Sequence, residues 1–559
     1  MTPTTDHPAT AVLSGTDVNT GAVMDTLTAS RARPSVDVTI PHGQVYHRVA
    51  QSLLPRWMRI LGGRSVLGGL GGPCSVPRNG PAVLLRQQAA ALGVGLVLDH
   101  DPPRSEGARL KESVRSALVR WQLSMRGDGC PVTAALRGSP LTAVIAGDVV
   151  HLLSETRGFQ TSALLNDLAN HLHWVARRSA MTPWAEAAAV GALSDGALLV
   201  RDRSLVSIAR ERLARLLVRQ DDEGWFPESG GADIGRLALT IDALARVYRQ
   251  SGWDELRGPL ARATKFLTHF VHPDDTAGGT YGSCGTAFMS PAGLELLAAS
   301  NDDAAWLAAA SRRNCERLDP ARLLCWDDDL CSLLGSRIAQ AAVNAPATLP
   351  HHAAPDAIAE AYRFFPSAGL VVYRNDSYFA AASIRRGGAL CVIWDGNRGR
   401  LDDAGVSVVH GKSSFTSNRQ DARTQGDVTP SSLRCHGVLR RAVRGRVGLR
   451  KRIRRWLRGR RPAAVDGATA RSGRSGNALR DLFERDITFE SDGIVIRDSV
   501  RCRRRADALL THAALTSTSS PSGEGSADPQ HRYQPGVDGS HHIEVVRVYR
   551  DGRLISRQG

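Results

Sequence analysis

Two hydrophobic periods divide the chain. Between about 105 and 345, apolar residues recur at intervals of three and four, most clearly in 205–217, 237–248 and 256–270. That spacing places apolar side chains on one face of a helix. The connections are short and rich in Gly, Pro and Asp. Helices joined in this way form successive antiparallel hairpins, so the pattern predicts an α/α toroid over 105–345.

After a linker at 346–365 the period becomes two, and β-branched and aromatic runs alternate with turn signals. Helices first and strands afterwards predict an α+β multidomain chain in which 366–559 forms an antiparallel β-sandwich. Two insertions are expected to interrupt it, at about 433–478 and 514–540. The expected strands are Gly369–Tyr373, Tyr378–Ile384, Ala389–Trp394, Val406–Val409, Ile487–Phe489, Ile494–Ile496 and Ile543–Val548.

The residues before the toroid look different. Residues 1–42 are rich in Thr, Ser, Asp and Pro and lack the basic start and apolar stretch of a secretory signal, so a disordered leader is expected. Residues 43–104 are expected to form a connector, with a helix interrupted at Pro55 and a Gly-rich stretch at Gly62–Gly72. The longest uncharged apolar run, Ala89–Leu98, has about half the length that a spanning helix needs.

Composition narrows the class of protein. Hydrophobic residues make up 42% and charged residues 23% of the chain, as in globular proteins. None of the nine cysteines forms a Cys-x-x-Cys pair, which argues against a zinc ribbon and fits a reducing cytoplasm. No metal or cofactor is expected.

The net charge of +16 is concentrated. Residues 434–461 hold 13 Arg or Lys and no acidic residue. Arg440–Arg461 could therefore contact an anionic membrane surface or another polyanion, or it could be a solvated insertion. Specific nucleic-acid binding is not predicted, because the rest of the chain is only mildly basic.

Three motifs carry candidate chemistry. They read DDEGWFPESGGADIGRL at 221–237, HPDDTAGGTYGSCGT at 272–286 and WDDDL at 326–330. With GGALCVIWDGNRGRLDDAG from Gly387, they resemble the heparinase II/III-like superfamily of polysaccharide lyases, closest to members that accompany exopolysaccharide genes. The resemblance implies a toroid followed by a sandwich, the architecture that the periodicity indicates independently.

The resemblance also implies β-elimination on uronic-acid glycans. A group must neutralise the carboxylate, a base must take the C5 proton, and an acid must protonate the leaving oxygen. Asn170 and His171 match the carboxylate neutraliser, and Tyr281 is the best remaining acid or base. Alternatively, Asn170 and His171 belong to an ordinary polar helix face, and Tyr281 packs against a neighbouring helical hairpin.

The chain departs from the family where the catalytic Tyr should stand, because position 236 is Arg236. The sandwich His expected before Asp403-Ala404-Gly405 is also missing, and His410 is the nearest substitute. Arg236 and His410 are taken as assisting catalytic groups. The residues assigned to substrate binding are Glu228, Trp225, Arg398 and Arg400.

The acidic cluster in 221–233 does not have the spacing of a calcium loop, and Asp233 is expected to cap the next helix. The aspartates of 327–329 resemble those of terpene-processing toroids, but the sandwich and the aspartate spacing both disagree with that class. Two functions remain open. One is cleavage of an acidic polysaccharide, and the other is non-catalytic glycan binding or scaffolding in polysaccharide assembly on a degenerate lyase fold. Lyases are commonly exported, so a periplasmic or extracellular location also stays open. The sequence does not indicate the oligomeric state.

Overall fold

The computed structural model describes most of the chain. The expected leader lies outside the described residues apart from its last residue, and so do 63–79 and most of the basic segment. The described residues are 42–62, 80–100, 106–178, 182–318, 323, 326–346, 354–397, 399–411, 413–442, 481–502, 508–516, 531–533 and 542–558.

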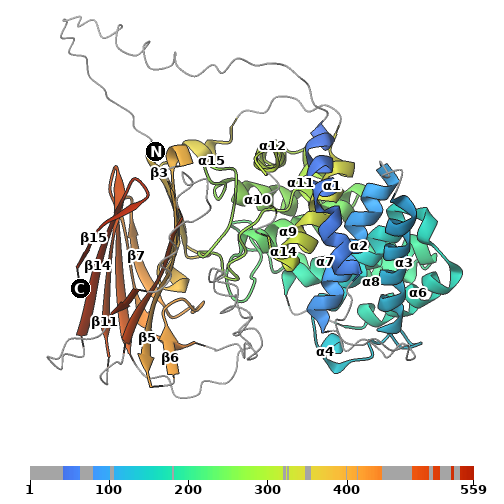
Figure 1. Ribbon diagram of the computed structural model, residues 1–559, viewed down its shortest axis with the longest axis horizontal. Coiled ribbons are helices and arrows are strands. Elements are labelled where there is room, and N and C mark those ends of the chain that lie inside the picture. Colours follow the sequence, from blue (N-terminus) through green and yellow to red (C-terminus); the bar gives the residue numbers. More distant parts are fainter. Residues whose placement is uncertain are drawn as a thin grey trace, which may run out of the picture. The chain divides into compact units, whose positions relative to one another are not determined.

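Helices occupy the first part of the described chain, and strands follow them, blue to yellow and then orange to red in Figure 1. The amphipathic segments expected at 205–217, 237–248 and 256–270 fall in α8, α9 and α10. The helices are α1 (His42–Leu61), α2 (Pro81–His100), α3 (Gly107–Leu123), α4 (Ala134–Arg137), α5 (Leu141–Glu155), α6 (Ser162–Ala176), α7 (Pro183–Val200), α8 (Ser204–Leu217), α9 (Ile234–Ser251), α10 (Arg257–Thr268), α11 (Ala292–Leu297), α12 (Asp302–Glu316), α14 (Asp328–Asn344) and α15 (Asp356–Ala359).

Six helices form a closed inner ring. Helices α2, α5, α7, α9, α11 and α14 contact one another in that order, and α14 returns to contact α2. Helices α1, α3, α6, α8, α10 and α12 pack around them. Inner helices such as α7 are buried on nearly every side, as the wall of a ring requires. The predicted α/α toroid is confirmed.

The ring begins earlier than the sequence indicates. Helix α2, which was expected in a connector, fills the gap between α14 and α5. It is long and apolar enough to cross a membrane by length and composition, but 72% of that apolar window is buried inside the fold. Helix α1 runs through Pro55 instead of stopping there. Trp57 anchors it, fully buried against Gly93 and Gly335, where a Cβ would collide with the indole ring.

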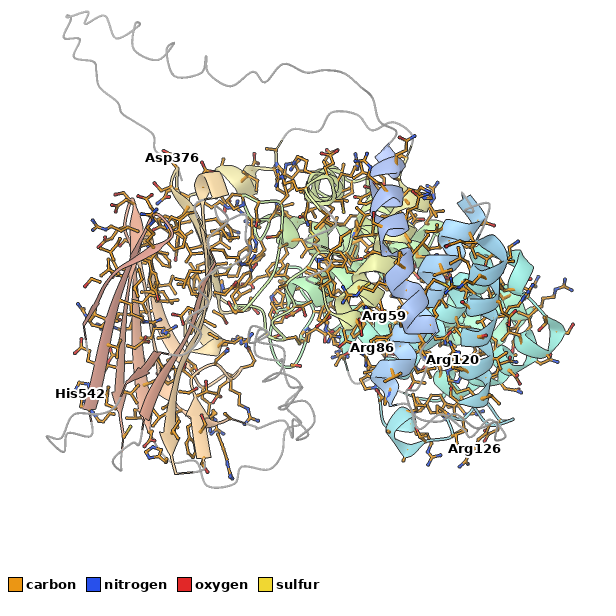
Figure 2. The ribbon with its side chains drawn as sticks, viewed as in Figure 1. Arg59, Arg86, Arg120, Arg126, Asp376 and His542 are labelled. Carbon is orange, nitrogen blue, oxygen red and sulfur yellow. The ribbon has the colours of Figure 1, made fainter. Side chains whose placement is uncertain are left out.

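Ion pairs fasten the ends of these helices together. The side chains of Arg59 on α1 and Arg86 on α2, both labelled in Figure 2, reach Asp328 and Asp329 at the start of α14. The aspartate run at 327–329 is therefore engaged in capping and ion pairing, because Asp327 caps α14 through the N–H of Leu330.

The strands form two antiparallel sheets, which confirms the predicted β-sandwich. The first sheet runs β1-β2-β3-β4-β5-β12-β13, with β6 paired to β5 and β9 paired to β6, and the second runs β15-β14-β11-β10-β8-β7. The strands are β1 (Tyr362–Phe365), β2 (Leu370–Arg374), β3 (Tyr378–Ser383), β4 (Ala389–Trp394), β5 (Gly399–His410), β6 (Ser413–Thr416), β7 (Gln425–Thr429), β8 (Ser432–Val438), β9 (Arg440–Arg441), β10 (Leu482–Phe489), β11 (Gly493–Arg501), β12 (Ala508–Thr516), β13 (His531–Tyr533), β14 (His542–Arg550) and β15 (Arg553–Gln558).

The two sheets differ in burial. Every residue of β3 and β4 is buried, because one face of the first sheet joins the helical core and the other faces the second sheet. Strands β10 and β14 alternate between buried and exposed positions, as expected of a sheet with one solvated face. Some element boundaries differ from expectation, since β1 lies in the expected linker and β8, β12 and β13 extend into the expected insertions.

A cluster of ion pairs lies between the sheets, and we call it the sandwich ion cluster. Asp403 on β5 accepts hydrogen bonds from Arg485 at 3.0 Å and from Arg547 at 2.6 Å. Asp498 on β11 binds the same two arginines. All four side chains are buried, and every carboxylate oxygen has a partner, whereas Nε of Arg547 makes no hydrogen bond.

Candidate functional site

The first two motifs lie on two loops that contact each other. The backbone N–H of Ser283 donates to the carbonyl of Ala232 at 2.9 Å, and the Ser283 hydroxyl donates to the carbonyl of Glu228 at 2.6 Å. Asp233 caps α9 through the N–H of Arg236, as predicted, and also accepts from the N–H of Cys284 at 2.8 Å. This one carboxylate therefore ties the loops together. We call the surrounding side chains the loop cluster: Trp184, Arg219, Glu228, Asp233, Arg236, Cys284 and Arg386.

Glu228 is the buried acid of the loop cluster. Its carboxylate accepts a 2.7 Å hydrogen bond from the backbone N–H of Trp184, at the start of α7. Burial raises the pKa of Glu228 to about 7, and the Trp184 N–H and the charge of Arg236 only partly offset that rise. A carboxyl group with such a pKa is part-protonated at neutral pH and can exchange a proton there.

Two arginines, Arg236 and Arg219, act on that carboxyl group, and a third, Arg386, contacts the neighbouring loop. The guanidinium of Arg236 lies 4.1 Å from the ring centroid of Trp184, in a cation–π contact, and is half-buried. Arg219 is exposed after α8, and its charge acts on Glu228. Arg386 donates to the carbonyl of Gly282 from the sandwich side. The loop cluster therefore carries more positive than negative charge, and protonation of Glu228 increases that excess.

Tyr281 ends a chain of hydrogen bonds. Its hydroxyl lies 3.1 Å from Nε2 of His272, and Nδ1 of His272 lies 2.8 Å from the Thr276 hydroxyl. The Thr276 hydroxyl donates to Asp274 at 2.6 Å, so it accepts from Nδ1–H. Nε2 of His272 is then the acceptor, and the Tyr281 hydroxyl donates to it.

The Tyr281 and His272 end of this chain of hydrogen bonds is sealed from solvent. Tyr281 has no exposed surface, its ring stacks on Phe270, and its oxygen accepts from the N–H of Gly278. Burial raises the pKa of Tyr281 well above its usual value and lowers the pKa of His272 to about 3. The phenol is therefore held protonated, and its polar atom is occupied by the protein.

Asn170 and His171 lie elsewhere, on α6. Nδ2 of Asn170 donates to the carbonyl of Gly127 at 2.9 Å, and Nδ1 of His171 lies 2.8 Å from the carbonyl of Gly129. The imidazole is fully buried and stacks on Trp174, and burial lowers the pKa of His171 to about 4. His171 is therefore a neutral core residue that holds the 127–129 turn.

His410 lies at the end of β5, inside the sandwich. Its Nε2 is 2.7 Å from a carboxylate oxygen of Asp481. Candidate ligand atoms of His410, Asp481 and Cys502 lie within 4.8 Å of one another, so these residues could hold a metal ion, although none is expected from the sequence.

Among the described residues assigned to substrate binding, Glu228 is the one that lies in the loop cluster. Trp225 is buried, and its indole N–H donates to Glu223 at 3.0 Å. Arg400 is half-buried and pairs with Asp402 at 2.7 Å. Arg398 lies outside the described residues.

The sequence reasoning missed three contributions to this region. Trp184 supports both Arg236 and Glu228 from a distant helix. His272 lies inside a motif, nine residues before Tyr281, and that spacing was the available signal. Glu223 accepts from the N–H groups of Ser367 and Ala368, which joins the helical loop to the turn before β2.

Comparison with known proteins gives structural likenesses only. No family model and no curated protein matches the chain. A chondroitin AC lyase variant from Streptomyces coelicolor A3 is 12% identical with a TM-score of 0.43, over 83% of this chain and 71% of that one. A heparinase III is 11% identical with a TM-score of 0.48, over 85% and 73%. A heparan sulfate lyase variant from Pedobacter heparinus is 10% identical with a TM-score of 0.40, over 94% and 90%.

With TM-scores below 0.5, these likenesses carry no weight for the reaction, and the toroid and the sandwich rest on the contacts described above.

Proposed function

We propose that this protein binds an acidic polysaccharide at the loop cluster and does not cleave it by β-elimination. The observation that carries the proposal is the state of Tyr281, the best acid or base in the motifs. Its phenol has no exposed surface, and its oxygen is engaged by His272 and Gly278. A proton carrier must lie within hydrogen-bond reach of the sugar, and this one is held inside the protein.

The loop cluster has the charge that an acidic glycan needs. Arg236 is half-buried on a flat indole ring, which orients its guanidinium at little further entropic cost. Arg219 is exposed beside it. Glu228, with a pKa of about 7, removes part of the opposing negative charge at neutral pH. Guanidinium groups recognise carboxylates and sulfates through paired hydrogen bonds.

The test is a binding assay of the full chain against heparan sulfate, chondroitin sulfate, hyaluronan and xanthan at two salt concentrations. We expect binding that weakens with salt and falls roughly tenfold in Arg236→Gln. The matched control is Arg109→Gln, at an exposed position on α3, which should bind normally. Failure to bind all four polymers at low salt rejects the proposal.

Cleavage is the second candidate, and the chain from Tyr281 through His272 and Thr276 to Asp274 favours it, because such a chain can hold a proton. The same incubations are followed by the ultraviolet absorbance of the unsaturated product. A rise that Tyr281→Phe abolishes would establish a lyase and replace the binding proposal.

A further inference from the structure

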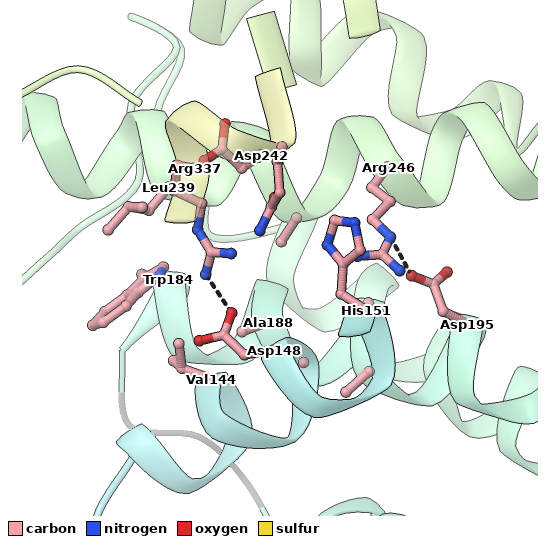
Figure 3. A pocket seen from close by; sticks show the side chains of 15 residues that line it. Val144, Asp148, His151, Trp184, Ala188, Asp195, Leu239, Asp242, Arg246 and Arg337 are labelled. Atoms are coloured by element: carbon pink, nitrogen blue, oxygen red, sulfur yellow. Dashed lines mark hydrogen bonds and ion pairs between the residues drawn. The ribbon is translucent and has the colours of Figure 1, made fainter. Parts of the chain in front are cut away.

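The axis of the toroid holds a polar cavity whose wall includes Trp184, which also belongs to the loop cluster. Two adjoining spaces of about 50 and 150 Å³ share His151, Asp242, Arg246 and Gln340 in their walls. The walls come from α5, α7, α9, α11 and α14, which are inner helices of the ring. Figure 3 shows charged side chains pointing into this space from facing helices. We call it the axial cavity.

Two ion pairs cross the axial cavity without using all their polar atoms. Arg337 pairs with one oxygen of Asp148 at 2.7 Å, and Arg246 pairs with one oxygen of Asp195 at 2.8 Å, as the dashed lines in Figure 3 mark. The other oxygens, Oδ2 of Asp148 and Oδ1 of Asp195, are buried and have no hydrogen-bond partner in the protein. Nη2 of Arg246 and Nε2 of Gln340 are buried and unpartnered as well.

Such atoms need a partner. Leaving a buried donor or acceptor unsatisfied costs about 1–3 kcal/mol, and most buried polar groups are bonded. Here the two acceptors, on Asp148 and Asp195, line the smaller space, and the two donors, on Arg246 and Gln340, line both spaces. Asp148, Asp195 and Gln340 are each at most 4% exposed, so bulk water does not reach these side chains freely.

The charged and polar side chains in the wall indicate which class of ligand the axial cavity can bind. Asp148, Asp195 and Asp242 outnumber Arg246 and Arg337, so an anion meets a net negative wall. A metal cation would have to compete with the arginines that already hold Asp148 and Asp195. A hydroxyl group both donates and accepts, and it can therefore serve a free carboxylate oxygen and a free N–H together.

The size of the axial cavity also fits a small ligand that carries hydroxyl groups. The larger space of about 150 Å³ has the size of a protein cavity that holds a benzene ring, and the adjoining space of about 50 Å³, lined by Asp148 and Asp195, adds room for the hydroxyl groups of a sugar ring. The larger space reaches solvent at Glu155, Arg249 and Gln250, which are exposed. Arg249 lies 13 residues along α9 from Arg236, which corresponds to about 20 Å, so this opening is distinct from the loop cluster.

We propose that the axial cavity binds one neutral polyhydroxylated ring, a single sugar or cyclic polyol, through Asp148, Asp195, Arg246 and Gln340. The ring enters between Arg249 and Glu155. Its hydroxyls donate to the two free carboxylate oxygens and accept from the free N–H groups. The four residues proposed to hold the ring do not belong to the loop cluster, so this proposal is tested separately from acidic-glycan binding.

The test uses saturation-transfer NMR and calorimetric titration of the full chain with glucose, mannose, galactose and myo-inositol. We expect at least one to bind, with affinity roughly tenfold lower in Gln340→Leu. Gln425→Leu, on exposed β7, is the matched control and should bind as the parent does. If Gln340→Leu does not fold, Asp195→Asn replaces it with the same expected loss.

Methyl glycosides of the three sugars separate two sources of the ring. Binding that survives capping of the anomeric oxygen indicates the end of a glycan chain, and binding lost on capping indicates a free sugar. No binding of any of the four probes, or equal binding by Gln340→Leu, overturns the proposal and leaves a hydrogen-bonded water cluster as the occupant.

Discussion

The sandwich ion cluster and the axial cavity both contain Asp–Arg ion pairs, but they differ in how many of the carboxylate oxygens accept a hydrogen bond. Between the sheets, Asp403 and Asp498 meet Arg485 and Arg547, and all four carboxylate oxygens accept hydrogen bonds. On the toroid axis, the Asp–Arg pairs leave one oxygen of each carboxylate free.

The difference lies in what surrounds each cluster. In the sandwich, two sheets close over the charges, and a missing partner would leave a buried charge with no compensation. In the toroid, six helices surround an axis that side chains do not fill, so the charges line a space. A closed network fixes the packing of the protein, whereas an open one can exchange partners with a ligand.

The largest expected effect comes from breaking the closed cluster. Arg485→Gln leaves Asp403 and Asp498 buried with one shared cation, which should lower the free energy of unfolding by about 3–5 kcal/mol. Urea denaturation followed by circular dichroism measures the loss.

The matched variant is Arg337→Gln in the axial cavity, where Asp148 can take up a proton or a water molecule. Arg337→Gln should lower the free energy of unfolding by less than Arg485→Gln does, by about 1–3 kcal/mol. Equal losses in the two variants would remove the contrast between a closed and an open network.

Elements of the fold could be predicted from the sequence where the local spacing of apolar and capping residues allowed one interpretation. Amphipathic spacing predicted α8 and α9, and a three-residue capping relation predicted the role of Asp233. Helix α2 was missed because an inner-wall helix is apolar on all sides and so has no helical period in its sequence. The closed ring could not be derived from the sequence, because it depends on α14 meeting α2 across more than 200 residues.

The site was harder to predict, because its contacts are non-local. The motif Tyr281 was found, but its burial depends on His272 and on packing against Phe270. His171 is a core residue because the 127–129 turn and Trp121 close over it, and neither is near it in sequence. The resemblance in motif order therefore indicated which loops form the candidate site, but it did not indicate which of their side chains are exposed to solvent.

The next effect in size is a dependence of stability on pH. Burial raises the pKa of Asp195 to about 6, and the unfolded chain should show the usual value of about 4. Between those values the folded protein holds a proton that the unfolded chain releases, so this group's contribution to stability falls as the pH rises from about 4 to about 6. The fall should not exceed about 3 kcal/mol.

Denaturation at a series of pH values checks this, with Asp195→Asn and with Asp376→Asn in an exposed turn (Figure 2) as the control. Asp195→Asn should flatten the decline between pH 4 and 6, and the control should keep it. A decline unchanged in Asp195→Asn would mean that the carboxyl group is already hydrated and that the axial cavity is more open to solvent than its lining indicates.

The smallest expected effect separates a binding group from a packing group. Nε2 of Gln340 is buried and makes no hydrogen bond within the protein, so Gln340→Leu removes no bond from the unliganded protein. Its free energy of unfolding should therefore change by less than about 1 kcal/mol, in contrast to Arg485→Gln in the closed cluster. Thermal denaturation with and without the sugar that binds most tightly provides the measurement. Because a ligand stabilises only the state that binds it, the parent should melt at a higher temperature with sugar present, and Gln340→Leu should show little of that increase. A large loss of stability in Gln340→Leu without sugar would make the amide a structural group, and the axial cavity would then differ from the sandwich ion cluster in shape alone.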